Sequence, residues 1–129
     1  ATVSAFGVEP DVAIALDVTL VGDTPESYPM AVSLGDGPTI KVMDSSVIVP
    51  AAVKNWMMQT AQKAGIKYQP EVLERGGTDT AAIQRSRAGV PAGCISIPCR
   101  YVHSANEVID MRDMEGALKV LLQFVDLSL

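Results

Sequence analysis

Apolar residues follow two patterns along this chain. A short continuous apolar run at 12–16 predicts a strand buried on both faces, and further strands are predicted at 39–43, 68–73 and 93–98. Apolar residues at helical spacing predict a helix from Pro50 to about residue 64, a second from about 79 to 88, and a third near the C-terminal end. Strands that alternate with helices in this way predict α/β layering.

The ends of the predicted helices carry local signals. Gly65 and Gly89 are expected to end the first two helices, because glycine readily adopts the left-handed backbone that follows a helix. Asp110 or Asp113 is expected to cap the last helix, and residues 104–107 have the spacing of a capping box. One face of the last helix is expected to carry five apolar residues, Met114, Leu118, Leu121, Leu122 and Val125.

The composition fits one folded domain in a reducing compartment. The chain has 129 residues, of which 48% are hydrophobic, and a formal net charge of −5. It has no basic stripe that would indicate nucleic acid as a partner, and no apolar run of the about 18–20 residues that a membrane span needs. Cys94 and Cys99 lie in one predicted strand and its exit, where a disulfide is sterically awkward. We therefore expect free thiols and a cytoplasmic protein.

Two polar residues do not fit a plain apolar core. Asp17 directly follows the run at 12–16, so we expect it at the carboxyl end of a strand buried on both faces, where an ionised carboxylate needs a metal, an arginine or backbone donors. His103, the single histidine, follows the strand at 93–98, and imidazole is a common metal ligand and acid–base group. Each residue alone also fits an ordinary turn. Together they favour a functional site, because both occupy the same edge of the predicted sheet.

Residues 74–79 form a loop with two adjacent glycines between a predicted strand and a predicted helix. A glycine pair lets the backbone approach a ligand closely or adopt positive φ. Thr78 or Asp79 can cap the next helix, whose first amides could bind a carboxylate or carbonyl oxygen. The loop lacks the spacing and the Lys-Ser/Thr pair of a phosphate-binding P-loop. A plain strand-to-helix turn remains the alternative interpretation.

Linked motifs occur in order along most of the chain: Ala15-Leu16-Asp17-Val18-Thr19 with 22–25, then 40–46, Leu73-Glu74-Arg75-Gly76-Gly77-Thr78-Asp79, 88–91, 95–98 and Arg100-Tyr101-Val102-His103-Ser104. Together they resemble the M42 metallopeptidases, which are glutamyl and deblocking aminopeptidases, some of them once labelled endoglucanases. The resemblance implies a mixed, largely parallel sheet flanked by helices, as the C-terminal portion of a zinc-peptidase-like α/β/α domain.

What the resemblance implies about chemistry is specific. Family members hold two divalent ions, zinc or cobalt with manganese as a further option, and release the N-terminal residue of a peptide with a metal-activated water. The resemblance places one metal ligand on Asp17 and another on His103. Candidate substrate-binding residues are Asp44, Gly76, Gly77, Thr78, Asp79 and Arg100, with Arg75 as a further candidate at the pocket wall.

The family's other motifs do not occur in this chain. They contain the general-base glutamate and the remaining metal ligands, which are expected upstream of Ala1 together with a dimerisation domain. Residues 1–129 are therefore expected to form the C-terminal segment of a catalytic domain, as a processed or truncated product without a catalytic base and inactive by itself. Its expected partners are peptide substrates, the missing N-terminal part of the same protein, and further copies in a homo-oligomer such as the family's dodecamer.

Two other functions stay open at this point. A truncated chain could act as a non-catalytic assembly or scaffold segment, because it lacks the base. Glycoside hydrolysis is suggested only by the old endoglucanase labels. That chemistry uses two carboxylates beside a sugar and leaves His103 without a role.

Overall fold

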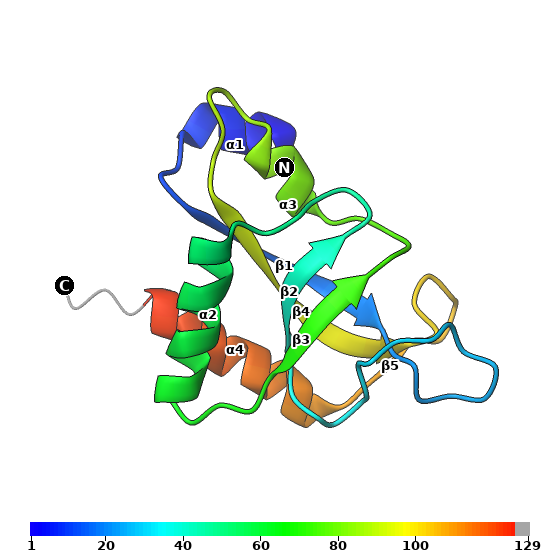
Figure 1. The fold of residues 1–129 in the computed structure, drawn as a ribbon. Helices are drawn as coiled ribbons and strands as arrows, with labels where there is room; N and C mark the ends of the chain where they lie inside the picture. Colours follow the sequence, from blue (N-terminus) through cyan, green and yellow to red (C-terminus); the bar gives the residue numbers. More distant parts are fainter. Residues whose placement is uncertain (126–129) are drawn as a thin grey trace.

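The structure, a computed structural model, describes residues 1–125 and alternates strands with helices (Figure 1). The predicted strands and helices are present, with boundaries that differ by a few residues. In chain order the elements are α1 (Thr2–Val8), β1 (Ala13–Leu20), β2 (Thr39–Asp44), α2 (Ala51–Lys63), β3 (Gln69–Leu73), α3 (Asp79–Gln84), β4 (Ala92–Arg100), β5 (Val108–Ile109) and α4 (Met111–Val125).

The strands form one mixed sheet in the order β1-β4-β2-β3, with the short β5 beside β4. β1 is parallel to β4 and β2 is parallel to β3, whereas β2 and β4 are antiparallel. This topology confirms the mixed, largely parallel sheet flanked by helices. Within residues 1–125, β1 is an edge strand whose single strand neighbour is β4.

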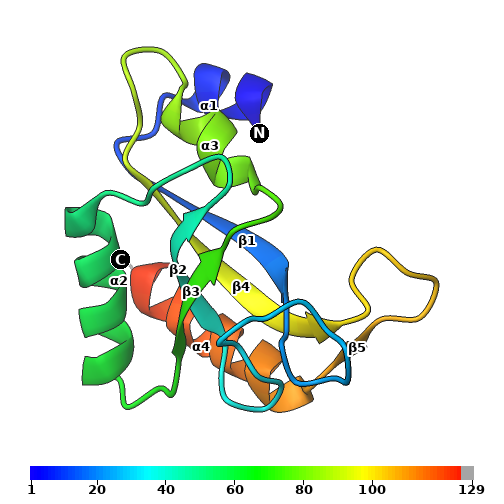
Figure 2. The same ribbon diagram turned by 45° about the vertical axis from the view of Figure 1, so that its right-hand side comes forward.

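One face of the sheet carries the apolar core, under α2 and α4 (Figures 1 and 2). Ile40 of β2 and Ile95 of β4 pack there with Met57 of α2 and Val120 of α4, and all four side chains are fully buried. A side chain at Gly93 would collide with the sulfur of Met57, so this glycine lets α2 approach β4 closely. The apolar residues of the two helices and of the two strands thus pack together in one layer.

The opposite face of the sheet is polar at its centre. Residues two apart in a strand share a face, so Thr39 and Lys41 lie opposite Ile40 in β2. The Lys41 ammonium forms an ion pair with Glu71 of β3, and neither side chain is exposed to solvent. Thr39 Oγ1 donates to Glu71 Oε2 at 2.5 Å, and Thr19 Oγ1 of β1 donates to Glu71 Oε1 at 2.7 Å. One carboxylate therefore joins three strands.

The structure corrects two expectations about β1. Pairing with β4 continues until Leu20 lies opposite Cys99, so Asp17 lies inside the strand opposite Ser96 and not at its carboxyl end. The strand is also not buried on both faces, since Leu16 is 57% exposed. The physical reason is its edge position: a continuous apolar run predicts burial only where other elements cover both faces.

Several helix boundaries also differ from expectation. α3 ends at Gln84 and not near residue 88, because the backbone N–H groups of Ser86 and Gly89 form turns beyond it. The capping-box prediction at 104–107 is wrong, since turns and bends occupy this segment and no helix begins there. Gly65 follows α2 with φ of 66°, as predicted.

The last helix begins as predicted but presents a different face to the core. Asp110 caps α4, because its Oδ1 accepts the backbone N–H of Arg112 at 2.8 Å. Ala117 and Val120 are buried, whereas Leu118 is 55% exposed and Met114, Leu122 and Val125 are also exposed. Of the face that was predicted, Leu121 is the residue that packs against the core.

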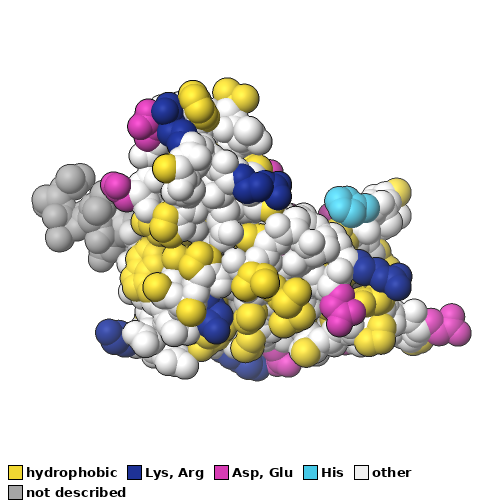
Figure 3. Space-filling view, turned by 45° about the horizontal axis from the view of Figure 1, so that its top comes forward, with side chains coloured by type: hydrophobic (Ala, Val, Ile, Leu, Met, Phe, Trp, Pro, Cys, Tyr) yellow, Lys and Arg dark blue, Asp and Glu magenta, His cyan; other side chains and the backbone are white. Residues whose placement is uncertain are grey.

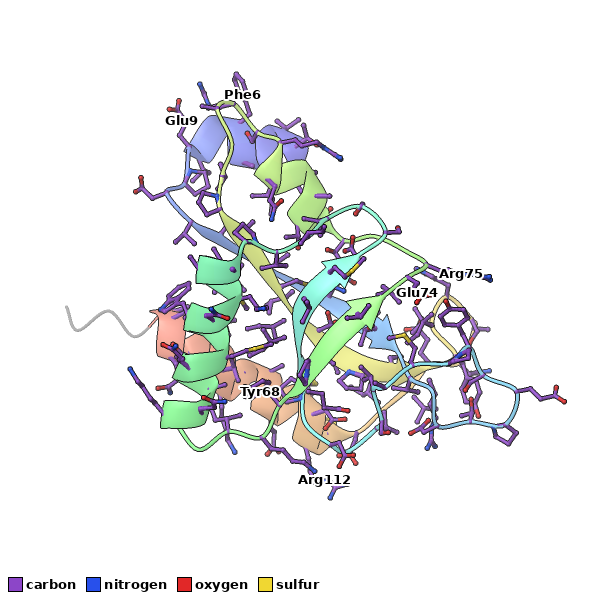
Figure 4. The ribbon with its side chains drawn as sticks, viewed as in Figure 1. Phe6, Glu9, Tyr68, Glu74, Arg75 and Arg112 are labelled. Carbon is purple, nitrogen blue, oxygen red and sulfur yellow. The ribbon has the colours of Figure 1, made fainter. Side chains whose placement is uncertain are left out.

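Helix α1 was not predicted, because contacts far along the chain hold it. The Arg87 guanidinium donates to the carbonyl of Phe6, pairs with Glu9 and lies 3.8 Å from the centre of the Phe6 ring. Figure 4 shows Phe6 and Glu9 at the end of this helix.

The two cysteines are buried free thiols, as predicted, and burial raises the pKa of Cys94 to about 11. None of the helices in the described part of the chain is long and apolar enough to cross a membrane.

Asp113 provides a test of how α4 is fixed. Its fully buried carboxylate accepts the backbone N–H groups of Gly35 at 2.7 Å and Gly37 at 2.8 Å. Asp113→Asn places an amide donor against one of these donors, so we expect a loss of about 1–3 kcal/mol in the free energy of unfolding. Urea denaturation measures this loss. The exposed Glu115→Gln change on the same helix is the control, and an equal effect of both changes would contradict the prediction.

Candidate active site

Asp17 and His103 line the same pocket, a cavity of about 140 Å³. Asp17 comes from β1, and His103 comes from the segment after β4. The loop after β3 adds a further wall, and the remaining lining comes from the rest of β1, the end of β3 and the residue before His103. In full, the pocket is also lined by Val18, Thr19, Leu20, Leu73, Arg75, Gly76, Gly77, Thr78 and Val102. Segments far apart in the sequence thus bring together two side chains of the type that binds divalent metal ions.

Asp17 enters the pocket from the middle of an edge strand and is partly buried. Its Oδ1 accepts the backbone N–H of Val18 at 2.8 Å. This bond is local, between adjacent residues, so it leaves the second carboxylate oxygen available to a ligand. A carboxylate in this setting can bind a cation without first breaking an ion pair.

His103 lies in a tight turn that Glu107 stabilises. Tyr101 and His103 both have positive φ, 61° and 63°, and Ser104 N–H donates to the carbonyl of Tyr101 at 3.0 Å. The backbone N–H of His103 donates to Glu107 Oε1 at 2.6 Å. The side chain of this single histidine is exposed, and it is visible in cyan at the surface in Figure 3. The turn therefore fixes the backbone while the imidazole stays accessible.

The Gly-Gly loop is held by the turn that follows β2. Asp44 is buried, and its Oδ2 accepts the backbone N–H of Thr78 at 3.1 Å and the Thr78 hydroxyl at 2.9 Å. The Ser45 hydroxyl donates to the carbonyl of Gly76 at 2.7 Å. A Cβ on Gly77 would lie 2.6 Å from the Ser46 hydroxyl oxygen, so this position has no room for a side chain. The glycine at 77 permits the close contact between the two turns.

Hydrogen bonds decide the acidity of Asp44. Burial by itself would raise the pKa of this carboxyl. The side chain and backbone of Ser46, the hydroxyl of Thr78 and the charge of Lys41 outweigh burial, and the pKa of Asp44 is lowered. The carboxylate is therefore ionised at neutral pH and is used to hold the pocket wall.

Three of the predicted substrate-binding residues, Asp44, Asp79 and Arg100, do not line this pocket, and Asp44 reaches it only through its bonds to Thr78. The Arg100 guanidinium forms a two-point ion pair with Asp23, with Nε–Oδ1 and Nη2–Oδ2 distances of 2.9 and 3.1 Å. This pairing raises the pKa of Arg100 and lowers the pKa of Asp23. Asp79, the first residue of α3, borders a separate cavity between α1, α3 and β1.

Tyr28 is a neighbour of the site that the sequence did not indicate. Its hydroxyl donates to Glu74 Oε2 at 2.6 Å, and the Arg75 guanidinium lies 5.0 Å from the centre of its ring. Figure 4 shows Glu74 and Arg75 together at the tip of the loop after β3. No spacing rule connects residue 28 with residue 75, and the aromatic residue by itself gave no signal.

Asp17 and His103 are two side chains of the pocket whose chemistry suits a metal ion. They are suitable oxygen and nitrogen donors, and the imidazole is accessible. Among residues 1–125, no three His, Cys, Asp or Glu side chains gather in a way that could hold a metal ion. A complete centre would need further ligands in addition to these two.

Comparison with known proteins gives a consistent result. The model of the family described as M42 glutamyl aminopeptidase matches residues 1–120. A putative aminopeptidase from Acetivibrio thermocellus is 48% identical, over 97% of this chain and 38% of that protein. The chain thus spans little more than a third of the length of this relative.

Two solved structures show the same fold. An aminopeptidase from the archaeon Desulfurococcus kamchatkensis matches with a TM-score of 0.93 and 39% identity, over 97% of this chain and 36% of that one. The TET1 peptidase of Pyrococcus horikoshii, which can assemble into a tetrahedron or a large octahedral shell, matches with a TM-score of 0.78 and 30% identity. That match covers 95% of this chain and 35% of the other chain.

The lowered pKa of Asp44 predicts a pH-dependent contribution to stability. Its folded-state pKa lies below the usual 3.8, so the ionised carboxylate stabilises the fold above that value, and the stabilisation is lost as the pH falls through the folded-state pKa. We therefore expect Asp44→Asn to destabilise the protein at pH 6 and to differ less from the unchanged protein near pH 3. Urea denaturation across this range measures the difference. A difference that stays constant with pH would contradict the prediction.

Proposed function

The chain belongs to the M42 glutamyl aminopeptidase family, and we propose that it is the C-terminal part of the catalytic domain of a metal-dependent aminopeptidase. The observation that carries the proposal is the shared pocket of Asp17 and His103. The resemblance predicted a metal ligand at each of these two positions, and the fold brings both side chains to one cavity.

In this proposal the two candidate ligands and the loop after β3 have separate tasks. Asp17 and His103 each contribute one ligand to a pair of divalent ions, zinc or cobalt, with manganese as a third option. When bound, such ions supply Lewis acidity toward the scissile carbonyl. Gly76, Gly77 and Thr78 form the wall against which the peptide lies, and Asp44 holds that wall without touching the peptide. Arg100 and Asp79 lie outside the pocket and have no direct task in the proposal.

The remaining parts of the site would come from an N-terminal segment of the same protein. The chain spans 38% of the Acetivibrio relative, and it offers two candidate ligands. The general-base glutamate and the other ligands would lie in that N-terminal segment, as the resemblance implies. The 129-residue chain alone is therefore expected not to hydrolyse peptides.

The surface of the chain supports this division. An apolar groove of about 390 Å³ runs between the edge strand β1, β4 and α4, with Leu16, Ile97, Met114 and Leu118 among its lining residues. Leu16 and Leu118 are more than half exposed. An unpaired strand beside an apolar groove is the surface that a further strand and helix of the same domain would cover. The groove also makes the chain prone to association when that cover is missing.

We extend the proposal to the partners and the compartment. The substrates would be peptides with a free N-terminus. The complete protein would form a homo-oligomer, as its structural relative from Pyrococcus does, with a dodecamer as the expected form. The buried free thiols fit a cytoplasmic location, where cysteines stay reduced.

Reconstitution tests the proposed function. The chain is purified, mixed with a separately produced N-terminal segment, and assayed with aminoacyl p-nitroanilides in the presence of zinc or cobalt. We expect no activity from either part and metal-dependent release of the N-terminal residue from the mixture. If the chain alone were as active as the mixture, the proposal that the site is divided between two segments would be contradicted. A mixture without activity would favour a non-catalytic assembly role.

Variants of the two ligands sharpen the test. Asp17→Asn and His103→Ala should each reduce activity of the complete enzyme by at least about 100-fold, because each removes a metal ligand. Asp11→Asn, an exposed change just before β1, is the matched control and should leave activity unchanged. Activity that survives both ligand changes would remove the chemical basis of the proposal.

A further inference from the structure

Asp17 has little support from its own strand. β1 is an edge strand, and β4 is its single strand partner in the described chain. The one hydrogen bond of the Asp17 carboxylate comes from the adjacent Val18 N–H, which moves with the strand. This bond does not tie Asp17 to any other element, so a contact from outside β1 is needed to fix where Asp17 points.

Thr19 supplies that contact. It lies two residues after Asp17 and therefore on the same face of β1. Its side chain is 2% exposed, and its hydroxyl donates to Glu71 Oε1 at 2.7 Å. Among residues 1–125 this is the one side-chain hydrogen bond that links β1 to a strand beyond β4. Glu71 is itself held by Lys41 and by Thr39, so the acceptor is a fixed point in the sheet.

We propose that Thr19 is a positioning residue, which fixes the Asp17 carboxylate in the pocket by tying β1 to the buried carboxylate of Glu71. The inference rests on the proposed function, in which Asp17 is a metal ligand. Thr19 itself does not bind the metal in this proposal. It sets the rotation of β1 about its axis, and this rotation decides where the carboxylate two residues earlier lies relative to His103.

The network contains a matched control for this proposal. Thr39 Oγ1 donates to the other oxygen of the same carboxylate at 2.5 Å, and it is also fully buried. Thr39 belongs to β2, which carries neither Asp17 nor His103. Thr19→Val and Thr39→Val remove the same kind of hydrogen bond from the same acceptor. Thr39→Val also removes the contact of Thr39 Oγ1 with the Ser96 carbonyl at 3.3 Å. Loss of stability should therefore be at least as large for Thr39→Val, whereas loss of alignment should follow Thr19.

The experiment measures metal affinity in the complete enzyme, in which this chain is joined to its N-terminal segment. Zinc affinity is determined by competition with a chromophoric chelator, and the Co²⁺ absorption spectrum reports the coordination geometry. We expect Thr19→Val to lower the affinity for the ion bound by Asp17 by roughly 10–100-fold and to change the cobalt spectrum. Thr39→Val should stay within about twofold of the unchanged enzyme, and Thr19→Ser, which keeps the hydroxyl, should restore affinity.

Each outcome decides the matter. Equal affinities of the two valine variants, or no recovery with serine, would overturn the positioning role. Should Thr19→Val fail to fold, Thr19→Ala and Thr19→Ser provide the same comparison with a smaller side chain. Asp17→Asn is measured in parallel. If that change leaves metal affinity intact, the proposed function fails, and this result is distinguishable from failure of the inference about Thr19.

Discussion

Lys41 and Glu71 form an ion pair with no access to solvent in the middle of the sheet. Removing water from both charges costs several kcal/mol for each ion, so such a pair contributes little net stability compared with apolar residues of the same volume. Its effect is on the choice of structure. Once Glu71 is buried and ionised, its two oxygens need donors, and Thr19, Thr39 and Lys41 provide them from two other strands. Arrangements of the strands that separate these residues leave a buried charge unpaired.

This constraint places the pocket. Beyond the network, β2 ends at Asp44 and β3 ends at the Gly-Gly loop. The hydrogen bonds between Asp44 and Thr78 connect these two strand ends. β1 carries Asp17 two residues before its own link to Glu71. Two of the three segments that line the pocket, β1 and the end of β3 with its loop, therefore depend on one buried carboxylate. His103 is independent of it and depends on the turn that Glu107 holds.

The sequence predicted the positions of strands and helices because those patterns are local. It also brought Asp17 and His103 together, although the reason given was partly wrong: Asp17 lies inside β1 and not at its end. Polar residues alternate with Ile40 and Val42 in β2, so one polar face of the sheet could have been recognised. The partner of Lys41 could not, because its choice of Glu71 depends on the pairing of β2 with β3. The role of Asp44 was missed for the same reason, because the Thr78 groups that donate to its carboxylate lie on a loop far along the chain.

The error on α4 has a different origin, and it bears on what the chain is. Periodicity identified Met114, Leu118 and Leu122 as an apolar face, but these residues are exposed, and Ala117 and Val120 pack on the sheet instead. A hydrophobic pattern records what a helix contacts in the complete protein, and it does not say which chain provides the contact. The exposed stripe on α4 and the exposed Leu16 of β1 border the same groove. We propose that a further segment of the domain covers that groove. The apolar stripe of α4 then packs on this segment, which corresponds to the part of the relatives that this chain does not span.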